Sequence, residues 1–171
     1  EEQLQRGVAA EISQALMEEV YTTPKPGLVD REDTGAHTDM NCQTFQKSTE
    51  AIAEDLAAMF EAGYSWEADP KTLFPLLRER GKKTEEKMFV ATGGVNTHKG
   101  IIFTIGILAA AAGISLRNYG KIESENVCRI SMEMTKKELE QDLRKLKQSS
   151  GITHGEKIYC HLGEKGVRAT P

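Results

Sequence analysis

Apolar side chains recur every three or four residues along most of this chain, which is the spacing of amphipathic helices. In the first twenty residues they stand four apart and predict one helical face made of Leu4, Val8, Ile12, Leu16 and Val20. A second stripe predicts a helix that starts at Asp39 or Asn41, either of which can cap it. This helix runs to about Ala62, and Gly63 is the expected stop.

The rest of the chain shows four further helical patterns. Asp69 and Pro70 are typical of a helix start, although Pro75 should bend or shorten that helix. Separate helices are predicted over residues 84–90, 99–112 and 123–149. No segment alternates convincingly with a period of two, as a strand would. We therefore predict an all-α fold, a single-domain helical bundle over residues 1–171 with functional loops between the helices.

The composition narrows the class of protein. The 171 residues suit one domain, and a net charge of −4 with acids and bases interleaved argues against a nucleic-acid binder. The longest apolar run, residues 101–114, is too short to cross a bilayer, so no membrane span is expected. Three widely spaced cysteines form no zinc or disulfide pattern, which favours a cytoplasmic location. Cys42 and Cys128 are expected in the helical core.

Residues 22–41, T-T-P-K-P-G-L-V-D-R-E-D-T-G-A-H-T-D-M-N, form the most informative segment. Prolines and glycines exclude a helix or strand, and apolar anchors such as Val29 indicate an ordered loop. Its side chains suit phosphate binding (Lys25, Arg31), Mg²⁺ binding (Asp30, Asp39) and acid–base work (His37). The alternative is a turn with an aspartate cap and solvated charges.

Residues 91–100, A-T-G-G-V-N-T-H-K-G, are the second polar cluster, just ahead of an apolar helix. Glycines let backbone N–H groups approach a phosphate, and the following helix N-terminus favours an anion. The predicted binding residues are Gly93, Gly94, Asn96, Thr97 and Lys99. His98 lies between them in the sequence and is a candidate catalytic residue. The spacing matches neither a Walker A loop nor a dinucleotide fingerprint. The alternative is a glycine-rich helix entry capped by Asn or Thr.

The third cluster is T-H-G-E, residues 153–156. His154 and Glu156 could form an acid–base or metal pair. The alternative is an ordinary surface turn.

Taken together, four motifs in sequence order resemble the triphosphoribosyl-dephospho-CoA synthase family. They are P-K-P-G-L-V-D-R, G-A-H-T-D-M, G-G-V-N-T-H-K-G and T-H-G-E, and the resemblance covers about residues 19–168. It implies a helical transferase that moves the triphosphoribosyl part of ATP to 3′-dephospho-CoA and releases adenine. The product would be the precursor of the prosthetic group of an acyl carrier protein in citrate lyase or malonate decarboxylase.

The resemblance gives the clusters roles. Lys25, Arg31 and Lys99 would clamp the triphosphate, while Asp30 and Asp39 hold Mg²⁺. His37 or His98 would take the proton of the attacking hydroxyl, and both stay open as the base. His154 or Glu156 would protonate the departing adenine. The oligomeric state stays open as well, a homo-oligomer included.

Two departures from the family pattern stand out. The first motif often ends in D-M-D, whereas Asn41 holds the last place here, either as a lost ligand or as a helix cap. The family continues into R-G-E and a further helical portion, so this chain is expected to be shortened at its C-terminus. Two other functions remain open: an all-α, Mg²⁺-dependent nucleotide hydrolase, and a non-catalytic module that binds a nucleotide or a CoA-like ligand.

Overall fold

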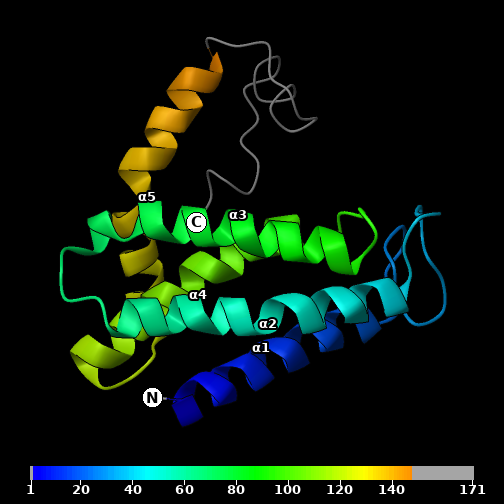
Figure 1. Ribbon diagram of the computed structural model, residues 1–171, viewed down its shortest axis with the longest axis horizontal. Helices are drawn as coiled ribbons and strands as arrows, with labels where there is room; N and C mark the ends of the chain where they lie inside the picture. The colour runs from blue at the N-terminus through cyan, green and yellow to red at the C-terminus, as the bar shows by residue number, and fades with distance from the viewer. Residues whose placement is uncertain (1, 148–171) are drawn as a thin grey trace.

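The structure, a computed structural model, describes residues 2–147, which form five α-helices and one short 3-10 helix without any strand (Figure 1). The all-α prediction is therefore confirmed for this part of the chain. The elements are α1 (Glu2–Tyr21), α2 (Cys42–Tyr64), η1 (Pro70–Thr72), α3 (Phe74–Ala91), α4 (Lys99–Tyr119) and α5 (Ser124–Lys147).

The core lies around the crossing of α2 and α4, which pack against each other more extensively than any other pair. Its fully buried members include Ile52 and Leu56 of α2 and Ile102 and Ile114 of α4. Two glycines permit the close approach: a Cβ on Gly63 would collide with the carbonyl of Ala110, and one on Gly113 with the carbonyl of Phe60. The helix α1 packs on α2, α3 packs on both α2 and α4, and α5 packs on α4.

Three predicted helix boundaries were wrong. Gly63 does not stop α2, because it is needed inside the helix for the crossing with α4. Pro75 does not bend α3, because it lies in the first turn, where its missing N–H is harmless, and one helix replaces the two predicted over this stretch. The helix α4 continues to Tyr119, where Gly120 ends it in the left-handed conformation.

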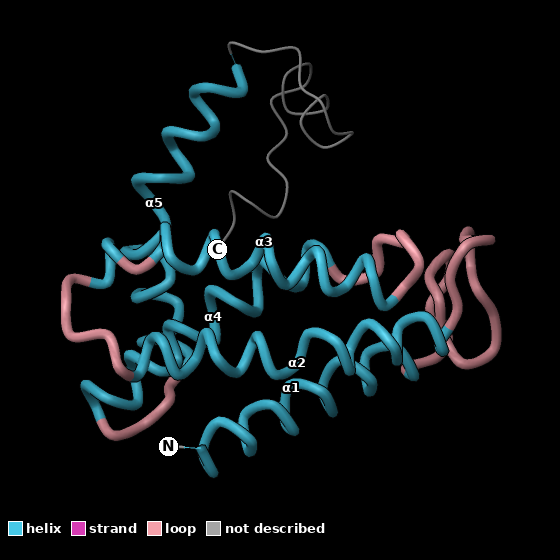
Figure 2. Tube along the Cα trace, viewed as in Figure 1, coloured by secondary structure: helices cyan, strands magenta, loops and turns pink. Residues whose placement is uncertain are grey.

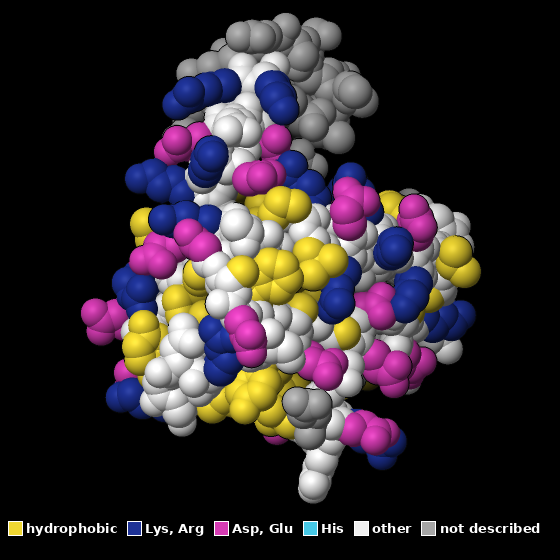
Figure 3. All heavy atoms as spheres, turned by 60° about the vertical axis from the view of Figure 1, so that its left-hand side comes forward, with side chains coloured by type: hydrophobic (Ala, Val, Ile, Leu, Met, Phe, Trp, Pro, Cys, Tyr) yellow, Lys and Arg dark blue, Asp and Glu magenta, His cyan; other side chains and the backbone are white. Residues whose placement is uncertain are grey.

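The helix α4 is long and apolar enough, by length and composition, to cross a membrane. Nine of its residues are buried against the other helices, which is how the core helix of a globular protein behaves. Part of its remaining apolar face, including Ile105 and Leu108, lines an open groove beside α1 and α5. Cys128 also lines this groove and is exposed, so its predicted core position was wrong; Cys42 is half-buried. Figure 3 shows hydrophobic side chains at the surface among charged ones.

The loops that carry the first two polar clusters lie at the same end of the bundle (Figure 2). One joins α1 to α2 and the other joins α3 to α4. The antiparallel helices thus bring together two segments that stand about fifty residues apart in the sequence, as the bond between Ser48 and His98 also shows.

Candidate functional site

The carboxylate of Asp30 organises the loop between α1 and α2. One of its oxygens accepts hydrogen bonds from the backbone N–H groups of Glu32 and Asp33, at 2.8 and 3.0 Å. The other accepts bonds from the backbone N–H of Lys25 and the hydroxyl of Thr23, at 3.0 and 2.9 Å. These bonds, led by those from Asp33 and Glu32, hold the pKa of Asp30 well below its usual range.

Further contacts fix this loop to the bundle. The thiol of Cys42, in the first turn of α2, donates to the carbonyl of Asp30 at 2.8 Å, and Val29 is buried. Gly35 adopts a positive φ of 58° directly against the backbone of Gly27, where a side chain would collide. The predicted ordered loop is therefore confirmed.

Asn41 caps α2, which decides between the two readings of this position. Its side chain accepts a bond from the N–H of Thr44 at 3.1 Å, and the hydroxyl of Thr44 accepts one from the N–H of Asn41 at 3.3 Å. Such a reciprocal pair satisfies two backbone donors at the start of a helix.

The two basic side chains of the loop differ in availability. Lys25 is largely covered, and its ammonium group bonds to the carbonyl and the carboxylate of Glu19 at 2.8 and 3.0 Å. Arg31 is exposed and lies over the ring of Tyr21, 4.4 Å from its centroid. Arg31 forms no ion pair within residues 2–147, so its guanidinium group keeps its donors for a ligand.

His37 and Asp39 lie together near the end of the same loop. The Nδ1 atom of His37 is 3.7 Å from a carboxylate oxygen of Asp39, and both side chains reach solvent. The loop thus places an imidazole and a carboxylate side by side where a substrate from solvent can reach them.

Gly93 and Gly94 close the end of α3. Both have positive φ, and their N–H groups donate back to the carbonyls of Val90 and Phe89, at 3.4 and 2.8 Å. These N–H groups are therefore already used, which differs from the predicted phosphate cradle. The side chain of Asn96 accepts a bond from the N–H of Lys99 at 3.3 Å, so Asn96 helps to start α4.

His98 is buried, with 1% of its surface exposed, and belongs to a chain of three side chains. The hydroxyl of Thr97 donates to the hydroxyl oxygen of Ser48 at 2.7 Å, and Ser48 lies 2.7 Å from Nδ1 of His98. The bond between Ser48 and Nδ1 of His98 has no fixed direction, because the donor depends on which ring nitrogen carries the proton.

The Nε2 atom of His98 is buried without a hydrogen-bond partner among the described residues. Burial lowers the pKa of His98 from 6.5 to about 4, while the nearby negative charge of Glu19 acts in the opposite direction. The ring is therefore neutral at pH 7. The ring of Phe45 meets it edge to face, at 5.1 Å between centroids. His98 is therefore a neutral, buried ring with one ring nitrogen that has no partner among the described residues.

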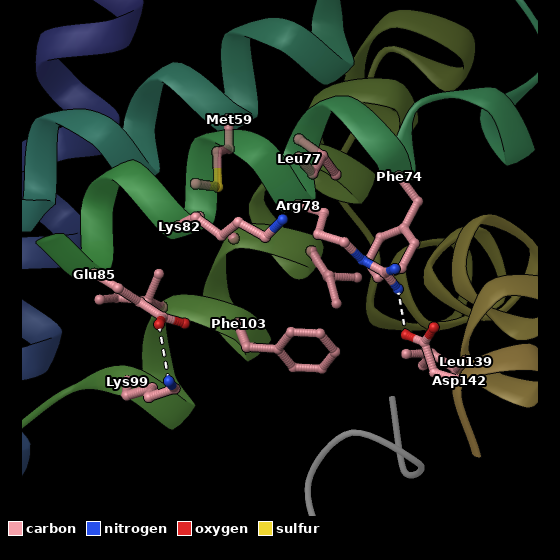
Figure 4. A pocket seen from close by; sticks show the side chains of 14 residues that line it. Met59, Phe74, Leu77, Arg78, Lys82, Glu85, Lys99, Phe103, Leu139 and Asp142 are labelled. Atoms are coloured by element: carbon pink, nitrogen blue, oxygen red, sulfur yellow. Dashed lines mark hydrogen bonds and ion pairs between the residues drawn. The ribbon is translucent and has the colours of Figure 1, made fainter. Parts of the chain in front are cut away.

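Lys99 begins α4 and forms an ion pair with Glu85 of α3 at 3.0 Å. Both residues belong to the lining of a cavity of about 390 Å³ between α3, α4 and α5 (Figure 4). The second polar cluster thus opens into a space of the size that small ligands occupy.

The predicted metal ligands Asp30 and Asp39 differ in how many of their acceptor positions are already used. A carboxylate has about four acceptor positions, and four donors already use those of Asp30, so it does not fit a magnesium ligand. Asp39 is exposed and fits such a role. Within residues 2–147 no group of three or more His, Cys, Asp or Glu side chains could hold a metal ion. His154 and Glu156 lie outside the described residues.

Sequence reasoning missed Ser48, Glu19 and Glu85, which contact three of the predicted site residues. Ser48 could have been noticed in the sequence, because it places a hydroxyl on the inward face of α2, between Phe45 and Ile52. The two glutamates look like ordinary helix-surface acids, and only the packing shows their partners.

Comparison with known proteins gives the family. The profile of the ATP:dephospho-CoA triphosphoribosyl transferase family matches residues 5–170. The chain belongs to this family. It is also similar to curated proteins named "Probable 2-(5''-triphosphoribosyl)-3'-dephosphocoenzyme-A synthase" from Streptococcus pyogenes serotypes M49, M3 and M1, each 38% identical over 178 aligned residues. No solved structure matches it.

The match to the transferase family includes every predicted site residue, because these lie between residues 25 and 156. The alignment covers 95% of this chain but 60% of each curated relative. The chain therefore spans about three fifths of their length.

Proposed function

We propose that this protein transfers the triphosphoribosyl part of ATP to 3′-dephospho-CoA and releases adenine. The family match over residues 5–170 is the observation that carries the proposal. The arrangement of the loops supports it, because the two loops that carry the basic, acidic and imidazole residues lie at the same end of the bundle (Figure 2) and Lys99 lines a cavity.

The reaction exchanges one bond for another at the anomeric carbon of ATP's ribose. A ribose hydroxyl of 3′-dephospho-CoA forms a bond to C1′, and the bond from C1′ to N9 of adenine breaks. Adenine leaves with the bonding electrons, and the hydroxyl proton goes to a base. Positive charge develops on the sugar as in glycoside hydrolysis, and the triphosphate is carried over intact.

Binding of the triphosphate falls to Arg31 and Lys99. Arg31 presents a free guanidinium fork, and Lys99 stands in the first turn of α4, where the helix dipole adds positive potential. Lys25, already paired with Glu19, positions the loop more than it binds phosphate. Mg²⁺ would enter with ATP and be held by Asp39, where it would neutralise triphosphate charge.

His37 takes the role of the base in this proposal. Its ring reaches solvent, and the carboxylate of Asp39 lies close enough to orient it. The other candidate base, His98, is buried and held by Ser48, so it positions the start of α4 in this proposal. In this proposal the proton for the leaving adenine comes from His154 or Glu156.

Several further points belong to the same proposal. The product would become the prosthetic group of an acyl carrier protein, the reaction would take place in the cytoplasm, and the enzyme could act as a homo-oligomer. None of these changes the chemistry above.

Mass spectrometry of the small molecules after incubation with ATP, Mg²⁺ and 3′-dephospho-CoA tests the reaction. The proposal predicts free adenine and a triphosphoribosyl adduct of dephospho-CoA. Formation of ADP or AMP without adenine would indicate the nucleotide hydrolase instead. Binding of ATP without any product would indicate the non-catalytic module.

A further inference from the structure

The cavity between α3, α4 and α5 has charged pairs at its two ends and an apolar middle. At one end Lys99 pairs with Glu85, and at the other Arg78 pairs with Asp142 at 2.6 Å. Figure 4 shows the ring of Phe103 between the two pairs. The remaining lining is mostly aliphatic: Met59, Leu77, Ile102, Ile107 and Leu139.

The end at Lys99 is the better place for an anion. Lys82 belongs to the same lining, and its only ion pair in the described chain is an exposed one with Glu79, three residues earlier on α3. Exposed pairs of this kind are weak, so Lys82 can turn to a ligand. The N-terminus of α4 adds its partial positive charge at the same place.

The end at Arg78 suits uncharged polar groups. Arg78 is neutralised by Asp142 and by Glu138, at 3.6 Å, and lies over the ring of Phe74. Such a pair can still donate to a carbonyl and accept from an N–H, so it can bind amide groups. The order of these groups along the cavity fits a ligand that has a phosphate at one end, then an apolar stretch, and then amide groups.

We propose that this cavity binds the acceptor, with the pyrophosphate of 3′-dephospho-CoA at Lys82 and its pantetheine arm over Phe103 toward Arg78, while Lys99 at the mouth stays with the triphosphate of ATP. The arm is long, uncharged and carries two amides, whereas ATP has no such extension beyond its phosphates. The choice of ligand rests on the proposed function. The orientation places the nucleotide end of the acceptor at the two loops, where its ribose hydroxyl must react.

Gly81 offers a direct test, because it lines the cavity and a Cβ built on it meets no heavy atom within 4 Å. Gly81→Phe should place a ring in the cavity, and the loss of a helix-interior glycine should help to keep the melting temperature near that of the wild type. Isothermal titration of the full chain with 3′-dephospho-CoA alone should show the Kd raised by about tenfold or more, since a filled pocket excludes its ligand. The Kd for ATP should not change.

Lys82→Ala provides the second variant, with Lys83→Ala as its matched control on the same helix, since Lys83 is exposed and outside the lining. Loss of a charge-assisted bond at Lys82 should raise the Kd for 3′-dephospho-CoA by about tenfold, and the control should not. The proposal is overturned if neither Gly81→Phe nor Lys82→Ala weakens dephospho-CoA binding, if both weaken ATP binding instead, or if the wild type does not bind dephospho-CoA.

These titrations need no turnover, so they separate the two proposals. Dephospho-CoA binding that depends on Gly81 and Lys82 supports the cavity assignment even if no adduct forms and the proposed reaction fails. Adduct formation with dephospho-CoA binding unchanged in both variants would reject the cavity assignment alone.

Discussion

At the scale of single residues, His98 and Asp30 show how burial and hydrogen bonds assign roles that residue type leaves open. Asp30 was predicted as a magnesium ligand and His98 as a candidate base, and both are buried polar side chains. Their chemistry could be named from the sequence, but the donors around Asp30 and the Ser48 bond to His98 come from the fold. Arg31 and Asp39 are exposed, so both side chains can reach a ligand as the sequence suggested.

The burial of His98 predicts how the folding stability depends on pH. Its folded pKa, lowered from 6.5 to about 4, means that the unfolded chain binds a proton in this range while the folded chain does not. Folding stability should therefore fall as the pH drops from 6.5 to 4, by about 3 kcal/mol from this group. Urea unfolding curves measured between pH 4 and 7 check this.

The matched variant is His98→Asn, whose side-chain amide can still form a hydrogen bond with Ser48 but does not titrate. Its stability should depend less on pH than that of the wild type, with the two curves diverging below pH 6.5. Parallel curves for the two proteins would show that His98 protonates equally in both states and would contradict its neutral, buried role.

At the scale of helices, the apolar pattern predicted the existence of each element better than its ends. Pro75 and Gly63 are residue types that often end or bend a helix. Pro75 does neither here because it lies in the first turn of α3. Gly63 lies within α2, one residue before its end, because the close packing of α4 needs a glycine there. The predicted face of α1 is only buried in its second half, at Leu16 and Val20, whereas Leu4 reaches the open groove.

The crossing of α2 and α4 predicts the cost of adding one methyl group. In Gly113→Ala the new Cβ would collide with backbone atoms of Phe60 and Tyr64, which cannot move as a flexible side chain can. We expect a loss of about 1–3 kcal/mol in unfolding free energy, as is usual for overpacking. Chemical denaturation gives this value directly.

Gly7→Ala in α1 is the control for this substitution, because a Cβ at Gly7 meets nothing within 4 Å. It should be neutral or stabilise by up to about 1 kcal/mol through helix propensity. Equal effects of the two alanines would show that the close helix crossing does not limit stability.

At the scale of the whole molecule, the antiparallel bundle places both polar loops at one end and extends the site along α3 and α4 into the cavity. The sequence motifs predicted the family, which the match over residues 5–170 confirms, while the role of these loops stays a prediction. The cavity could not be predicted, because its lining comes from α2, α3, α4 and α5 and most of it looks like ordinary core.

The most direct test is the rate of adenine release from ATP in the presence of 3′-dephospho-CoA, compared among the wild type, Arg31→Ala and Arg117→Ala. Arg117 lies in the last turn of α4, at the far end from Lys99, and serves as the control. The account predicts adenine release that requires dephospho-CoA, falls by about tenfold or more in Arg31→Ala, and is unchanged in Arg117→Ala. Adenine release that is equal in all three proteins would contradict the placement of the reaction at the loop end of the bundle.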